Sequence, residues 1–340
     1  MYHPSSNKSE LIGIMLLYVD DIFTMAPTSV IQGALAAIQK HWKMTVTGII
    51  QRDNTVPEKP VSEINILGCR VTTGDDGTVN LDQIGYIHEK LAERGYEGSH
   101  GKTSLPDMIQ KRLIPTPKEE RQTTEFLEYR KKCQEECGVL VWITGKTRPD
   151  LASAVSMIAS LAAFNPKEAF DMIKGIWQYV AYTHDRALVY GKHDEQGMRI
   201  ETDASFAPDG DRSRTGIVIF WRGNLIFWHS SSQSMATLST AEAEMGATVP
   251  GLKYGLAIHT FIMDIEPDTS EEVRKIHLRG DNLATITTLM HQVTSWRTRH
   301  YAVKAAWARD IIYAVGIDVK HTPGEFWSRT SSRRFSKERG

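Results

Sequence analysis

The sequence has few cysteines and no long apolar run. Its three cysteines, Cys69, Cys133 and Cys137, are too few for a disulfide framework and are not spaced as a four-ligand zinc site. The longest apolar stretch near the start, residues 12–19, is followed by two aspartates and falls short of the roughly 20 residues that a membrane helix needs. The N-terminus also lacks the pattern of a signal peptide. We therefore expect a soluble protein in a reducing, intracellular compartment.

An excess of positive charge is also absent. The 340 residues include 40 Lys plus Arg and 41 Asp plus Glu, which gives a formal net charge of -1 at pH 7. Any nucleic-acid site must therefore be local. With 41% hydrophobic and 24% charged residues, the chain is long and apolar enough for two or more domains, and wholesale disorder is excluded.

The first 120 residues contain short strand and helix patterns. These patterns predict, in order, strands at 11–19 and 22–25, a helix at 29–43, a strand at 64–71 and another strand after the turn at 75–77. Two acids, Asp20 and Asp21, lie at the tip between the first two strands. Residues 106–120, rich in Pro, Lys and Thr and without an apolar period, predict a linker.

After the linker, three helices are followed by a mixed pattern. The helices are predicted at 125–144, 151–164 and 166–182. The rest of the pattern predicts strands at 198–206, 215–221 and 224–228, a helix from Ser239, a strand at 275–280, a helix at 296–315 and a strand at 317–321. This order predicts an α/β unit built on a mixed sheet.

Three acids of this C-terminal unit come from separate elements. Asp203 lies at the end of the first strand, Glu244 in the first helix, and Asp281 directly after the fourth strand. Acids so placed can converge on one point, as a site for two divalent ions requires. Oxygen-only ligands favour Mg²⁺ or Mn²⁺ over zinc. The alternative is that each acid is an ordinary solvated turn residue.

Glu242 and Glu244 compete for one position in this site. Two residues along a helix rotate a side chain by about 200°, so only one of them can face the other acids. Ser239 and Glu242 fit a capping box at the helix start. Glu244 is therefore predicted to face the site, and Glu242 to point away.

Several C-terminal segments, taken in order, resemble one known family. They are 202–205 (TDAS), 211–216 (DRSRTG), 238–244 (LSTAEAE) and 281–282 (DN). Together they resemble the ribonuclease H domain of copia-type LTR retrotransposon polyproteins. Residues 147–152 (TRPDLA) and 154–156 (AVS) resemble the connection region of that family. Near the start, 18–21 (YVDD) resembles the reverse transcriptase active-site hairpin, 66–68 (ILG) its primer-grip strand, and 85–87 (GYI) the start of its thumb.

The resemblance implies an α/β fold, α+β overall, with a ribonuclease H-like mixed sheet and flanking helices at the C-terminus. It divides the chain into a reverse transcriptase palm remnant (1–80), a thumb-like segment and linker (81–120), a helical connection (121–195), a ribonuclease H-like domain (196–328) and a disordered tail (329–340).

The resemblance also implies an activity, hydrolysis of the RNA strand of RNA·DNA hybrids with two ions of Mg²⁺ or Mn²⁺. Asp203 would bridge the ions, and Glu244 and Asp281 would each support one. The rest of the polyprotein, fingers and integrase, would be a further partner. The location would be the cytoplasm, a virus-like particle or the nucleus.

The sequence departs from the family pattern at several places, among them residues 299–302 (RHYA), where the family has an acid and this chain has none. The remnant polymerase acids Asp20 and Asp21 have only ten residues before their strand, so we expect the third palm carboxylate and the fingers to be missing and polymerase function to be incomplete. The fourth acid that the ribonuclease H family carries after a late proline is absent after Pro323. Pro250 lies inside the helix that carries Glu244, which predicts a kink or a break there.

Candidate contacts to the phosphates of a hybrid lie near the three acids. Phosphate contacts use Lys, Arg and small polar donors without reading sequence. The candidates are Arg212, Arg214, Ser232, Gln233, Arg297, Arg299 and His300. The rival interpretation of the whole chain is a catalytically dead retroelement relic that at most binds nucleic acid.

Overall fold

The computed structural model describes residues 2–5, 8–50, 61–98, 101–102, 104–105, 114–207, 212–291 and 301–323. Part of the predicted linker, the candidate contacts Arg297, Arg299 and His300, and the predicted tail 329–340 lie outside the described residues.

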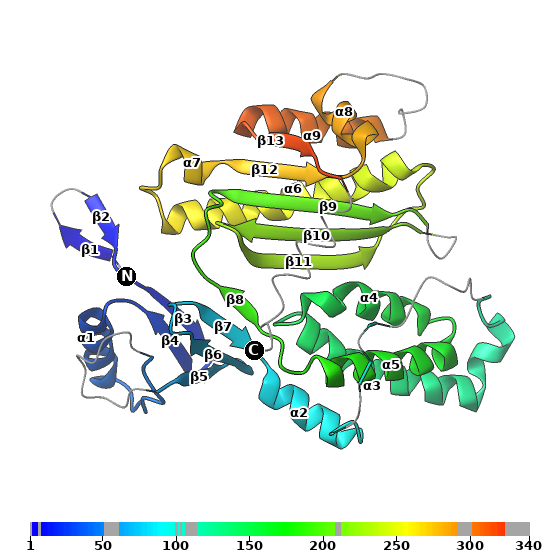
Figure 1. Cartoon of the computed structure of the whole chain (residues 1–340), viewed down its shortest axis with the longest axis horizontal. Helices are drawn as coiled ribbons and strands as arrows, with labels where there is room; N and C mark the ends of the chain where they lie inside the picture. Colours follow the sequence, from blue (N-terminus) through cyan, green and yellow to red (C-terminus); the bar gives the residue numbers. More distant parts are fainter. Residues whose placement is uncertain are drawn as a thin grey trace.

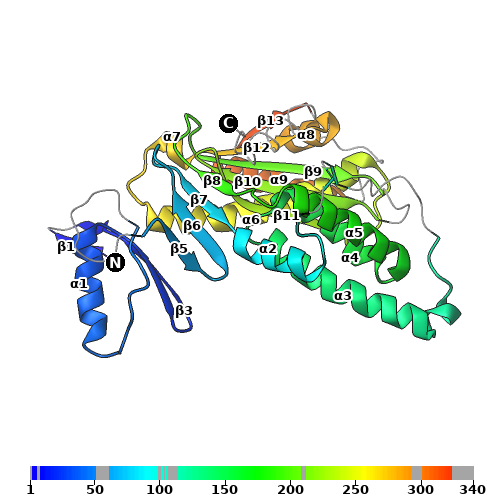
Figure 2. The ribbon, with the colours of Figure 1, turned by 60° about the horizontal axis from the view of Figure 1, so that its bottom comes forward.

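Two separate hairpins and a helix form the N-terminal part. The elements are β1 (Tyr2–Ser5), β2 (Lys8–Leu11), β3 (Ile14–Tyr18), β4 (Asp21–Met25) and α1 (Thr28–Gln39). Strands β3 and β4 pair antiparallel, with Tyr18 opposite Asp21 at the tip, so the predicted acidic hairpin is confirmed. Its first strand is shorter than the predicted 11–19, because Leu11 ends β2 and β3 begins at Ile14. This hairpin and α1 lie at the opposite end of the molecule from the helices α3 to α5 described below (Figures 1 and 2).

A small antiparallel sheet follows, in the order β5-β6-β7-β8. Its strands are β5 (Glu63–Ile66), β6 (Cys69–Thr73), β7 (Val79–Asp82) and β8 (Leu188–Tyr190). The prediction of one strand over 64–71 is wrong, because Leu67 (φ 50°) and Gly68 (φ 76°) form a two-residue turn between two strands. The ring of Trp142 packs over this turn, 3.2 Å from where a Cβ on Gly68 would lie.

Four helices enclose the first large core. They are α2 (Ile84–Glu93), α3 (Thr124–Thr144), α4 (Ala152–Leu161) and α5 (Pro166–Tyr182), with 3-10 turns at Lys118–Gln122 and Pro149–Leu151. The three predicted helices after the linker are thus confirmed. Ile87 and Leu91 of α2 belong to the same buried cluster as Leu140 of α3 and Trp177 of α5. The helix at the predicted thumb start therefore packs on the predicted connection.

The C-terminal sheet unit (residues 196–323) contains the five-stranded sheet in the order β11-β10-β9-β12-β13. Its elements are β9 (Met198–Ser205), β10 (Arg214–Trp221), β11 (Asn224–Ser232), α6 (Thr240–Ile265), α7 (Glu271–Arg274), β12 (Ile276–Gly280), α8 (Leu283–Met290), α9 (Ala302–Val315) and β13 (Asp318–His321). Strand β10 is antiparallel to β9 and β11, whereas β12 is parallel to β9 and β13. The predicted mixed α/β sheet is therefore confirmed. The short helices α7 and α8 were not predicted.

One apolar core joins this sheet to its helices. Ile200 of β9, Ile219 of β10 and Leu278 of β12 are buried against Leu252 of α6 and Ile312 of α9. The core fixes α6 across the strands, and this positions the acid that the helix carries.

Helix α6 continues through Pro250, so the predicted break is not found. A proline inside a helix removes one backbone hydrogen bond and disfavours the preceding turn. Close packing on β9 opposes this cost, because Gly251 and Gly255 are buried directly on the strand. A methyl group at Gly251 would overlap with Thr202, and one at Gly255 with Ile200.

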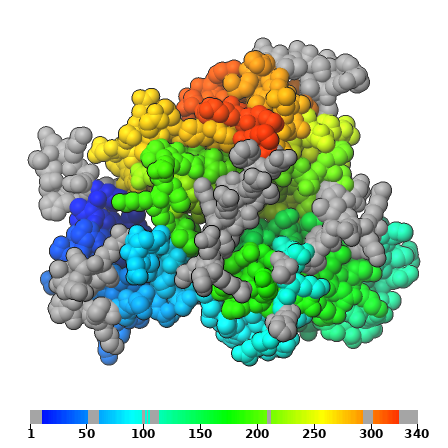
Figure 3. Space-filling model, viewed as in Figure 1, coloured from blue at the N-terminus to red at the C-terminus, as the bar shows by residue number. Residues whose placement is uncertain are grey.

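The helical core and the five-stranded sheet are joined through β11 and β8. The indole Nε1 of Trp228 donates to the carbonyl of Thr144, at the end of α3, at 2.8 Å. Leu188 of β8 shares a buried cluster with Phe220 and Leu225 of β10 and β11. In the space-filling view the green β8 segment lies between the C-terminal sheet unit and the cyan strands (Figure 3).

No helix within the described residues is both long and apolar enough to cross a membrane.

Candidate metal centre

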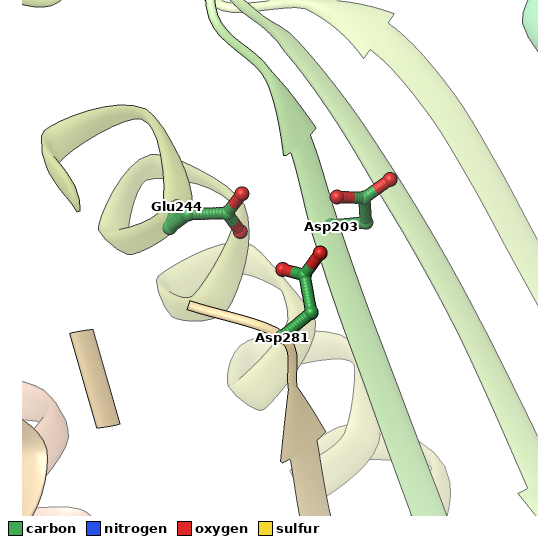
Figure 4. A group of neighbouring side chains, drawn as sticks. All are labelled: Asp203, Glu244 and Asp281. Carbon is green, nitrogen blue, oxygen red and sulfur yellow. The ribbon is translucent and has the colours of Figure 1, made fainter. Parts of the chain in front are cut away.

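The structure brings Asp203, Glu244 and Asp281 together at one edge of the five-stranded sheet. Strands β9 and β12 are parallel neighbours with Glu201 opposite Arg279, and Asp203 and Asp281 lie two residues farther along each chain. Glu244 reaches the same point from α6 (Figure 4). One carboxylate oxygen from each residue lies within 4.8 Å of the other two. The predicted convergence of the three acids is therefore observed.

The first turn of α6 separates the roles of its two glutamates. Ser239 Oγ accepts a hydrogen bond from the Glu242 N–H at 3.2 Å, and Glu242 Oε2 accepts from the Leu238 N–H at 2.6 Å. Ser239 thus caps the helix, and Glu242 is occupied at the helix start by its bond to the residue before the cap. Glu244 is only 7% exposed, and its Oε1 accepts from the Ala204 N–H of β9 at 3.2 Å. Glu244, as predicted, is the glutamate that faces the other acids.

The three carboxylates disturb one another electrostatically. Burial, together with the charges of Asp203 and Asp281, raises the pKa of Glu244 to about 8. Loss of solvation and the neighbouring Asp281 carboxylate also raise the pKa of Asp203. Both shifts mean that concentrated negative charge is unfavourable in the metal-free fold.

A divalent cation fits this donor set. Three carboxylates supply the hard oxygen ligands that Mg²⁺ and Mn²⁺ prefer. Among the described residues this is the only group of three or more His, Cys, Asp or Glu side chains that lie close enough to hold a metal ion. A cation would offset the desolvation and the repulsion that together raise the pKa values of Asp203 and Glu244.

Hydroxyl groups to which the sequence analysis assigned no role lie beside the centre. The Thr248 hydroxyl donates to the Glu244 carbonyl at 2.9 Å and lies 3.3 Å from the hydroxyl of Thr202. A small cavity beside Glu244 is lined by both threonines and by Thr285. The sequence signal was available, since Thr248 is one helical turn after Glu244 and Thr202 directly precedes Asp203.

The acids of the N-terminal hairpin are placed differently. Asp20 and Asp21 are both exposed at the tip between β3 and β4. They belong to no group of three potential metal ligands within the described residues.

The predicted nucleic-acid contacts divide into two kinds. Arg212 is exposed just before β10. Arg214 is only 4% exposed, and its guanidinium donates to Ser232 Oγ at 2.8 Å and to Ser156 Oγ of α4 at 2.6 Å. The Gln233 amide donates to the Ala243 carbonyl at 2.7 Å and so ties the start of α6 to the end of β11. Arg214, Ser232 and Gln233 thus have structural contacts, and Arg212 is the exposed cation of the described candidates.

Comparison with known proteins identified retrotransposon polyproteins as relatives. The chain is 26% identical over 310 residues to the retrovirus-related Pol polyprotein from transposon TNT 1-94 of Nicotiana tabacum, which covers 88% of this chain and 21% of that protein. It is 26% identical over 244 residues to the Pol polyprotein from transposon RE1 of Arabidopsis thaliana, with 70% and 15% covered. The chain thus spans about a fifth or less of the length of these relatives.

A solved structure was also matched. This chain is 17% identical to LC11-RNase H1, a protein isolated from compost by a metagenomic approach, in the crystal structure of its complex with an RNA/DNA hybrid. The match covers 40% of this chain and 91% of that chain, with a TM-score of 0.29. No family model matches the chain. The resemblance stated from the motifs is confirmed by the polyprotein relatives, and the chain is a homologue of the copia-type retrotransposon Pol polyproteins.

Proposed function

We propose that the C-terminal sheet unit is a ribonuclease H-like domain that hydrolyses the RNA strand of RNA·DNA hybrids with divalent cations. The observation that carries this proposal is the convergence of Asp203, Glu244 and Asp281 within 4.8 Å at one edge of the mixed sheet. The homology to retrotransposon Pol polyproteins supports it.

Each acid has a distinct part in this proposal. Asp203, Glu244 and Asp281 would hold the divalent ions, with Asp203 shared between two ions and Glu244 and Asp281 each supporting one. Bound divalent ions at such a site lower the pKa of an attacking water and stabilise the leaving oxygen. The Ala204 N–H, bonded to Glu244 Oε1, fixes that side chain toward Asp203 before an ion arrives.

The nucleic acid would be held mainly through its phosphates. Arg212 lies in the segment between β9, which carries Asp203, and β10, and offers an exposed cation. An A-like hybrid presents its 2′-hydroxyls in a shallow minor groove, where the RNA strand can be recognised. Because the net charge of the whole chain is close to zero, such phosphate contacts would have to come from local cations.

The N-terminal part completes the proposal. Residues 1–80 are a reverse transcriptase palm remnant, 81–120 a thumb-like segment and 121–195 a connection. The remaining segments of a Pol polyprotein are potential partners. Within the described residues, Asp20 and Asp21 belong to no group of three potential metal ligands, so we propose that this hairpin by itself supports no polymerase activity.

Cleavage of a labelled RNA·DNA hybrid by the full chain tests the proposal. Wild type should cleave only with Mg²⁺ or Mn²⁺, and Asp203→Asn should lower the rate at least about a hundredfold, because metal ions supply several kcal/mol of transition-state stabilisation. Glu244→Gln should behave similarly. Glu242→Gln is the matched control, since it makes the same change two residues away and keeps an acceptor for the Leu238 N–H.

Two results would contradict the proposal. Metal-dependent cleavage that survives Asp203→Asn would place the activity elsewhere in the chain. A wild type that binds the hybrid but cleaves none of it would favour the rival, a catalytically dead relic that retains nucleic-acid affinity.

A further inference from the structure

Of the three acids, Asp281 is the one that lies outside a helix or strand. Strand β12 ends at Gly280, whose carbonyl accepts from the Thr322 N–H at 2.8 Å. On the other side, Asn282 is the N-cap of α8, with its Oδ1 accepting from the Thr285 N–H at 2.9 Å. Asp281 is thus a single residue between a strand end and a helix cap.

A histidine from the neighbouring strand contacts this single residue. His321 is the last residue of β13 and lies opposite Gly280 in the parallel ladder. Its ring Nε2 is 2.8 Å from the main-chain oxygen of Asp281. Because a carbonyl can only accept, the ring must donate through Nε2. The side chain therefore extends the hydrogen bonding of the sheet edge by one residue.

We propose that His321 is a positioning residue of the candidate metal centre, which acts through the main chain of Asp281. The ring holds the Asp281 carbonyl, and with it the orientation of the residue that carries the carboxylate. This inference rests on the proposed function, because it assumes that Asp281 is a metal ligand. Groups that orient metal ligands typically contribute about ten- to a hundredfold to metal affinity.

The alternative is an exposed hydrogen bond without consequence for the site. His321 is exposed, so the lower end of that range, about tenfold, is the expected effect. A second histidine provides a matched control. His259 Nε2 is likewise 2.9 Å from a main-chain oxygen, that of Arg274. His259 is 15 residues after Glu244 on α6, which is about 22 Å along the helix.

Titration of the full chain with Mn²⁺, without nucleic acid, tests the proposal by calorimetry or by the electron paramagnetic resonance signal of free Mn²⁺. His321→Leu should weaken binding about tenfold. His321→Gln places an amide donor near the position of Nε2 and should stay within about twofold of wild type. His259→Leu should bind Mn²⁺ as wild type does.

Wild-type affinity in His321→Leu would overturn the inference and leave the proposed function standing. So would equal weakening in His321→Gln and His321→Leu, because the donor would then not matter. If wild type binds no Mn²⁺ at millimolar concentration, the proposed function fails together with the inference.

Discussion

Replacing Glu244 by glutamine should stabilise the metal-free protein at alkaline pH. Glutamine has the same shape, keeps an acceptor for the Ala204 N–H and cannot ionise. The pKa of Glu244 rises from an ordinary value of 4.5 to about 8 because the residue is buried beside Asp203 and Asp281. The folded protein therefore holds a proton at Glu244 over a range in which the unfolded chain has lost it.

The sign and the size of the effect follow from this difference. Between pH 4.5 and about pH 8 the folded state binds more protons than the unfolded state, so stability falls as the pH rises. At about 1.4 kcal/mol for each pH unit, the full loss is on the order of 5 kcal/mol. Glu244→Gln avoids this loss. Its advantage over wild type should be close to zero at pH 4.5 and several kcal/mol at pH 8.5.

Hydrogen exchange of β9 and α6 peptides, in the presence of a chelator at several pH values, measures this advantage locally. Millimolar Mg²⁺ should reverse the order, because only wild type has the complete ligand set and gains stability from binding. Glu242→Gln should show neither effect. Equal protection of wild type and Glu244→Gln at pH 8.5 would refute the electrostatic reasoning.

Three further variants test other parts of the structure. Arg148→Met should destabilise the helical core by about 2 to 4 kcal/mol in urea unfolding, and an unchanged midpoint would contradict this. The Arg148 guanidinium is 1% exposed and pairs with Asp150 at 2.9 Å, and in the variant Asp150 would keep only Arg186, at 3.1 Å, as a cation partner. Gly255→Ala should cost about 1 to 3 kcal/mol by thermal unfolding, since its methyl group would overlap with Ile200, whereas Gly138→Ala on α3 meets no atom within 4 Å and should not destabilise. Asp21→Asn should leave Mn²⁺ binding and hybrid cleavage unchanged because Asp21 is exposed on the separate hairpin, and loss of either would show that the hairpin contributes to the site.

Periodicity predicted the long elements well, because their signal is local. The helices α3 and α5 and the strands β9 and β10 have the apolar spacing of their type. Helices of 17 and 21 residues and strands of eight residues are long enough to show that spacing fully. Local signals failed for short elements. β8 has three residues, and the pairing with β7 that makes it a strand spans more than a hundred residues of sequence.

Turn chemistry explains another error. The segment 64–71 is strand-like in composition on both sides of the pair Leu67-Gly68. Glycine adopts positive φ readily, but leucine does so rarely, so the sequence does not indicate that both residues have positive φ. Packing of Trp142 over the turn supplies the missing constraint, and that contact comes from a helix 74 residues away.

The convergence of the three acids could be predicted from the sequence, whereas the burial of a nearby cation could not. Asp203 lies near the end of β9 and Asp281 directly follows β12. These parallel strands pair directly, so their positions alone place both acids at one edge of the sheet. A capping box already assigned Glu242, which left Glu244 for the site.

Arg214 shows the limit of this reasoning, because its charge and its place near Asp203 fitted a phosphate contact. In the fold its guanidinium bonds Ser156, 58 residues earlier in the chain, and docks α4 on the sheet. Which cations face solvent depends on how two separately built cores pack together, and no local pattern encodes that.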